Sequence, residues 1–111
     1  MKRTKFLAAL AVVAAPFLCA AETWTSVPMV DVACAAKAKA NPDAHTRECA
    51  VACVKSGFGI VTPAGDFLKF DAKGNEHAAA ALQANQRNDH LRVTVTGELV
   101  GGTIQVQSLK M

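Results

Sequence analysis

Three cysteines and one histidine lie close together in this chain: Cys34, His45, Cys49 and Cys53. Thiolate sulfur and imidazole nitrogen are common zinc ligands, and thiolates also suit cuprous copper. Two of the thiols could instead join in a disulfide. The spacings of four residues from His45 to Cys49 and from Cys49 to Cys53 predict that these three side chains share one face of a helix.

The helix that positions them is predicted to start at Asn41-Pro42 and to run to about Lys55. Asn is a good N-cap, and Pro suits the first helical position, where no N–H is needed. A Ser-Gly pair follows and ends the helix. The arc that carries Arg47 and Lys55 must face water, so we expect the cysteine face to point inward, where Cys34 could reach it.

The first 21 residues have the pattern of a secretory signal peptide. Three basic residues within the first five precede an uncharged apolar run that ends in Cys19-Ala20-Ala21. The apolar run is too short to span a membrane, and cleavage is expected near Ala21. We therefore expect a secreted or periplasmic protein in which residues 22–111 form a single small domain.

Removal of the signal peptide changes the charge and the cysteine count. The full chain has 12 Lys+Arg and 9 Asp+Glu, and the signal peptide carries three of the basic residues and none of the acidic ones. The mature chain is therefore near neutral, without the positive charge expected of a nucleic-acid binder. Without Cys19, three cysteines remain, which indicates a disulfide plus a free thiol, a bound metal, or a link to another molecule.

One interpretation is a structural disulfide from Cys34 to either Cys49 or Cys53. Small secreted domains commonly need such a bridge, and one that closes a loop of this length contributes about 3 kcal/mol. A bridge between Cys49 and Cys53 is disfavoured because a helix orients their side chains poorly for it. We favour the structural disulfide because it is the usual role of cysteines in an oxidising compartment.

The alternatives are a metal site and a redox site. Cys34, His45, Cys49 and Cys53 could hold zinc, or copper if only the thiolates bind. His45 and Cys53 lie about 12 Å apart along a continuous helix, so they share an ion only if the helix breaks. Redox chemistry is the third interpretation, although there is no Cys-x-x-Cys motif and an inward thiol has a raised pKa and poor access.

Five strands and a second helix are expected in the mature chain. The segment from Leu91 alternates apolar and polar residues, Gly97 is expected to form a bulge, and Gly101-Gly102 is expected to make a tight turn. Pro63-Ala64-Gly65 predicts another turn. The expected strands are Trp24–Val32, Phe58–Thr62, Asp66–Phe70, Leu91–Val100 and Thr103–Leu109, and the second helix runs from about Asn75 to Gln86.

This order, with a helix between the third and fourth strands, is that of the OB-fold. We therefore expect a mainly β protein with two helices (α+β), a five-stranded OB-fold-like barrel with an extra helix between strands 1 and 2.

The mature chain also resembles a group of small secreted bacterial OB-fold proteins that carry Cys and His in an inserted helix and to which no activity is assigned. The shared elements are Asp31 to Cys34 at the end of the first strand, His45 with Cys49 and Cys53, and the Gly65 to Leu68 hairpin. The resemblance implies the fold, and it implies that the Cys/His set belongs together.

The sequence contains no recognisable acid/base pair and no nucleophile motif, so we do not expect an enzyme. We expect a non-enzymatic secreted or periplasmic binding protein, whose partner is a small ligand, a metal ion or another envelope protein. The alternative is an envelope metal-binding (Zn or Cu) or thiol-redox factor that uses Cys34, His45, Cys49 and Cys53. We expect no nucleic-acid binding and no membrane span.

Overall fold

The computed structural model describes residues 21–111, so the expected signal peptide lies almost entirely outside the described part. The strands are β1 (Glu22–Asp31), β2 (Phe58–Val61), β3 (Phe67–Phe70), β4 (Arg92–Val100) and β5 (Thr103–Lys110). The α-helices are α1 (Ala35–Ala38), α2 (Arg47–Ala52) and α3 (Ala72–Ala84). Short 3₁₀ turns occupy Val32–Cys34, Pro42–Ala44 and Val54–Ser56.

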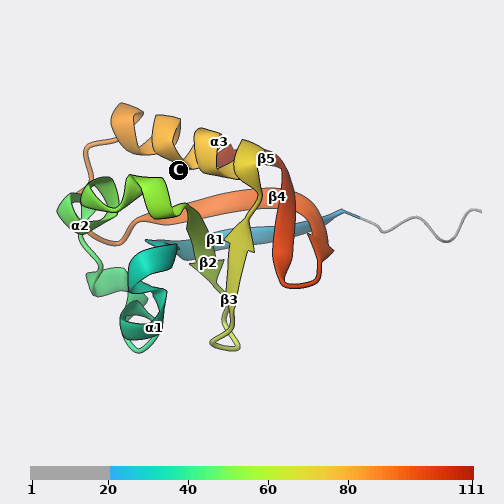
Figure 1. Cartoon of the computed structure of the whole chain (residues 1–111), viewed down its shortest axis with the longest axis horizontal. Coiled ribbons are helices and arrows are strands. Elements are labelled where there is room, and N and C mark those ends of the chain that lie inside the picture. The colour runs from blue at the N-terminus through green and yellow to red at the C-terminus, as the bar shows by residue number, and fades with distance from the viewer. Residues whose placement is uncertain (1–20) are drawn as a thin grey trace, which may run out of the picture.

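The five strands form a closed barrel in the order β1-β2-β3-β5-β4. All neighbours are antiparallel except β3 and β5, which pair in parallel. Helix α3 lies between β3 and β4 in the chain, and α1 and α2 lie between β1 and β2 (Figure 1). The expected small OB-fold-like barrel is confirmed, with its inserted segment in two short helices in place of one.

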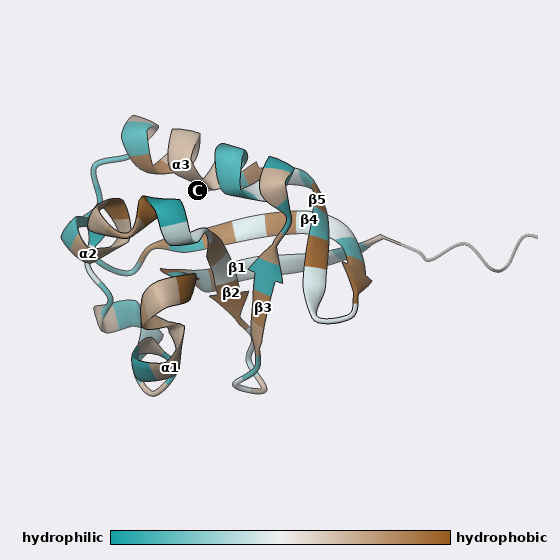
Figure 2. Ribbon diagram, viewed as in Figure 1, coloured by the Kyte–Doolittle hydropathy of each residue, from teal (hydrophilic) through white to brown (hydrophobic). Residues whose placement is uncertain are grey.

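The barrel interior holds the apolar residues that the strand alternation predicted. In β4, Val93 and Val95 are buried, and in β5, Ile104 and Val106 are buried. In Figure 2 the strands β2 and β3 carry brown, apolar stretches, whereas α3 alternates apolar and polar residues. The register of the β4–β5 pair shifts between Thr96 and Gly97, which confirms the expected bulge.

Helix α3 starts a few residues earlier than expected. Asp71 is its N-cap, and its carboxylate accepts a hydrogen bond from the backbone N–H of Gly74 at 2.9 Å. Gly74 must be small, because a Cβ atom there would lie 2.4 Å from a methyl carbon of Val106. The helix therefore packs closely on β5, with Ala78 and Leu82 buried in the core.

The continuous helix expected from Asn41 to Lys55 is wrong. The chain leaves the 3₁₀ turn Pro42–Ala44 at His45, which has an extended backbone, and α2 then begins with Thr46 as its N-cap. The Thr46 hydroxyl accepts a hydrogen bond from the Cys49 N–H at 3.2 Å. Because Thr46 caps a new helix, the helical phase is reset at that point.

The new phase changes which side chains of α2 point inward. Ala50 is buried in the main core, whereas Cys49 is exposed. The expectation that the whole cysteine face points inward is therefore wrong for Cys49. Helix α1 packs Ala35 and Ala38 on Val30 and Val61 in a second, smaller apolar cluster. None of the helices in residues 21–111 has both the length and the apolarity to span a membrane.

Candidate functional site

The centre of the candidate site is Asp31, the last residue of β1, which is fully buried. One carboxylate oxygen, Oδ2, accepts a hydrogen bond from the backbone N–H of Cys34 at 3.0 Å. The other, Oδ1, accepts one from Nε2 of His45 at 2.5 Å. The two bonds fix the orientation of the carboxylate, because each of its oxygens has a partner.

Backbone contacts bring the segments on either side of Asp31 together. The N–H of Val32 donates to the carbonyl oxygen of Gly57 at 2.8 Å, and the N–H of Ala33 donates to the Ser56 hydroxyl at 3.1 Å. The 3₁₀ turn after β1 is thus held against the 3₁₀ turn after α2. Cys34 and Cys53, which stand in and next to these turns, become neighbours although 19 positions separate them in sequence.

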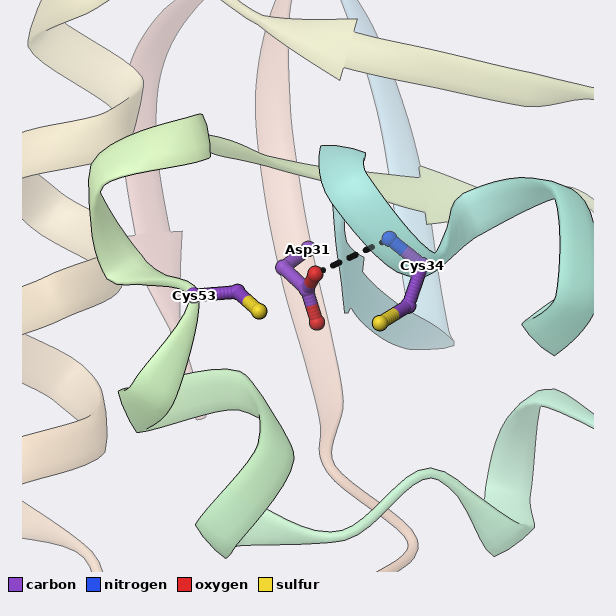
Figure 3. Close-up of side chains that lie close together, drawn as sticks. All are labelled: Asp31, Cys34 and Cys53. Carbon is purple, nitrogen blue, oxygen red and sulfur yellow. Dashed lines mark hydrogen bonds between the residues drawn. The ribbon is translucent and has the colours of Figure 1, made fainter.

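Asp31, Cys34 and Cys53 form a group of potential metal ligands. One carboxylate oxygen and the two sulfur atoms all lie within 4.8 Å of one another. Figure 3 shows both cysteine side chains extending toward the Asp31 carboxylate. Asp31 is buried, and the two cysteines are half-buried. We call these three residues the Asp-Cys-Cys cluster.

The cluster is electrostatically unfavourable for a free thiolate. Partial burial, followed by the Asp31 carboxylate and the Cys53 side chain, raises the pKa of the Cys34 thiol. A nearby negative charge disfavours a second negative charge, so in the absence of a cation the thiol keeps its proton. A metal ion at this point would offset the negative charge of the carboxylate and the thiolates.

The four residues singled out from the sequence have different places. Cys34 and Cys53 belong to the Asp-Cys-Cys cluster. His45 is buried beside them, with its ring on Asp31. Cys49 lies outside the cluster, but it lines a surface hollow together with Cys34 and His45. All three thiols are free.

Sequence reasoning named Asp31 only as the start of the shared element Asp31 to Cys34, and it did not include the carboxylate among the candidate ligands. The signal that points to it is the spacing Asp-Val-Ala-Cys. An Asp three residues before an N–H donor at a strand end is a capping pattern, so its carboxylate is turned toward the residue that follows. The observed bond from the Cys34 N–H to Asp31 follows this pattern.

A second polar contact holds the inserted segment to the barrel. Arg92 on β4 donates from Nε and Nη2 to the two carboxylate oxygens of Asp43, at 3.0 and 2.8 Å. This forked bond with Arg92 lowers the pKa of Asp43. The N–H of Arg47 donates to the carbonyl oxygen of Asn88 at 2.7 Å, which fixes the start of α2 to the loop before β4.

Comparison of the sequence with protein-family models, with curated proteins and with solved structures gave no match. The chemistry of the side chains is therefore the basis on which a function is inferred.

Proposed function

We propose that this chain is a non-enzymatic metal-binding protein of the cell envelope, exported by its N-terminal signal peptide. Its ligands are Cys34, Cys53 and Asp31, and its metal is zinc or cuprous copper. The observation that carries the proposal is the distance within the Asp-Cys-Cys cluster, whose three ligand atoms lie within 4.8 Å of one another.

These distances suit a common ion. Two sulfur atoms bound to one tetrahedral zinc ion lie about 3.8 Å apart, because a Zn–S bond is about 2.3 Å long. Ligand atoms within 4.8 Å of one another therefore have to approach by up to about 1 Å. The cluster thus needs only small side-chain movements to close around an ion. Thiolates are soft ligands, which favours zinc and cuprous copper over calcium or magnesium.

His45 orients the Asp31 ligand through a hydrogen bond. Its Nε2–H donates to Asp31, as groups in the outer shell of metal sites orient the ligand beside them. The ion takes the place of the thiol protons, so each thiolate that binds releases one proton. The Asp31 carboxylate, which disfavours a bare thiolate on Cys34, then attracts the bound cation.

The test is an equilibrium titration of reduced, metal-free protein. Zinc is titrated against a chromophoric chelator and cuprous copper against bicinchoninate, with native mass spectrometry to count the ions bound per chain. We expect Cys34→Ser and Cys53→Ser each to lower the affinity by about 100-fold or more. Ala52→Ser, an exposed change next to Cys53, is the matched control and should bind like the wild type.

Two outcomes would overturn the proposal. The first is a wild-type protein that retains neither ion in competition with the chelators. The second is binding that Cys34→Ser and Cys53→Ser leave at the wild-type affinity, since the ion would then be held elsewhere.

A structural disulfide between Cys34 and Cys53 is the second candidate, and the same proximity of the two sulfur atoms favours it. It would join the end of β1 to the end of α2 and would contribute about 3 kcal/mol. The intact mass of exported protein under denaturing conditions distinguishes the two. A mass lower by two hydrogens, with no native metal adduct, supports the disulfide; a full-thiol mass with a native adduct supports the metal site.

Thiol-redox activity is less well supported. A reactive cysteine needs a lowered pKa, and the surroundings of Cys34 raise it.

A further inference from the structure

A surface hollow lies next to the Asp-Cys-Cys cluster. Among the side chains that line it are Cys34, Lys37, Asn41, His45 and Cys49. Cys34 therefore belongs to two groups, the cluster on one side and the hollow on the other. Because Cys34 lines the hollow, an ion held there lies beside one ligand of the cluster.

Cys49 is the exposed thiol of the three. It is held in the first turn of α2, where its N–H donates to the Thr46 hydroxyl. It lies outside the group of ligand atoms that share the 4.8 Å separation. The Cys49 thiol is therefore open to solvent and to the hollow, but it is not one of the ligands that would hold the ion at equilibrium.

We propose that Cys49 is the receiving ligand for cuprous copper, which it takes from a donor outside the protein and passes across the hollow to Cys34 and Cys53. This inference rests on the proposed function. Soft thiolates bind Cu(I) readily, and a Cu(I) ion of low coordination number can accept an incoming thiolate before an outgoing one leaves.

The transfer consists of ligand exchanges without any change of oxidation state. Cys49 loses its proton to solvent and forms a sulfur–copper bond as the bond from copper to the donor breaks. Cys34 then loses its proton and bonds to the copper, and Cys53 follows. The bond to Cys49 breaks, and the Cys49 thiolate takes up a proton again. The copper remains Cu(I) throughout.

The test measures the rate of copper transfer separately from the affinity. Reduced protein is mixed in a stopped-flow instrument with Cu(I)–bicinchoninate, and the loss of the colour of the complex is followed. We expect Cys49→Ser to slow the transfer by about tenfold or more while the equilibrium affinity stays within about twofold of the wild type. Val51→Ser, an exposed change on the same helix, is the matched control and should transfer at the wild-type rate.

Three outcomes separate the possibilities. A Cys49→Ser rate equal to that of the wild type overturns the inference and leaves the metal site intact. An affinity that falls as far as it does in Cys53→Ser also overturns it, because Cys49 is then an equilibrium ligand. A wild-type protein that takes no copper from the complex overturns both the inference and its copper premise, and the zinc titration still tests the site.

Discussion

The buried Asp31 carboxylate is the residue whose replacement the structure predicts to have the largest effect on the inserted segment. Asp31→Asn keeps the shape of the side chain but replaces one oxygen by an NH₂ group. That group faces either the backbone N–H of Cys34 or the imidazole Nε2 of His45, since each oxygen of Asp31 bonds to one of them. If the NH₂ group faces Cys34, the backbone N–H there loses its acceptor. If it faces His45, the bond to the carboxylate is replaced by a bond between neutral groups, in which the imidazole nitrogen accepts.

The expected cost follows from the kind of bond that is lost. A hydrogen bond to a charged group contributes about 1.5–3 kcal/mol, and a buried donor left without an acceptor costs a similar amount. We therefore expect Asp31→Asn to lower the free energy of unfolding by about 3 kcal/mol. A small domain has about 5–15 kcal/mol in total, so this is a large fraction of its stability.

The measurement is urea denaturation of the reduced, metal-free protein, followed by tryptophan fluorescence and by circular dichroism. A loss of about 3 kcal/mol lowers the midpoint by about 1–3 M urea. Asp66→Asn, a change of the same kind on an exposed side chain in the β2–β3 turn, is the control and should lie within about 0.5 kcal/mol of the wild type.

A double-mutant cycle with His45→Ala shows how much of the cost belongs to the contact between Asp31 and His45. We expect a coupling free energy of about 1.5–3 kcal/mol, because the two side chains bond directly. An Asp31→Asn protein as stable as the Asp66→Asn control would refute the reasoning, as would a coupling indistinguishable from zero.

Three further predictions follow from other contacts. Asp43→Asn should lower the free energy of unfolding at pH 7 by only about 0.5–1 kcal/mol, because its partner Arg92 is partly exposed. The folded pKa of Asp43 is lowered, so this contribution is present above the unfolded pKa of about 3.8 and is lost as the pH falls through the folded pKa. Urea denaturation of both proteins at a series of pH values measures it. Gly59→Ala should lower the free energy of unfolding by about 3 kcal/mol, because the added Cβ would lie 2.4 Å from the carbonyl oxygen of Leu68. Gly65→Ala should lower it by only about 1 kcal/mol in the same assay, because there the Cβ meets open space and the cost comes from the φ of 91°. In metal-free protein, the alkylation rate of Cys34, followed by peptide mass spectrometry, should rise at a higher pH than that of an unperturbed cysteine, because its pKa is raised; a midpoint at or below the ordinary value contradicts this.

The amino-acid sequence was sufficient to predict the barrel, its strands and the turn between the last two. Leu91, Val93 and Val95 alternate with polar residues, and all three are buried as the period of two requires. The turn at Gly101-Gly102 lies between β4 and β5, and both glycines have positive φ. These features are local, because a strand's alternation and a turn's conformation depend on residues within a few positions of each other.

The candidate site depended on contacts that no local pattern contains. The two spacings of four residues, from His45 to Cys49 and from Cys49 to Cys53, place these side chains on one face only in a continuous helix. Thr46 starts a new helix, in which Cys49 is exposed. His45 leaves the helix and donates to Asp31.

Asp31 itself illustrates what only the tertiary structure decided. Alternation puts it on the face of β1 opposite Val30, which in a one-sided strand would be exposed. The inserted segment, folded back over the end of β1, covers that face as well, so Val30 and Asp31 are both buried. Because Cys34 and Cys53 reach Asp31 from the two ends of that segment, the sequence supplied the ligand types, and the path of the chain over the barrel determined which of them meet.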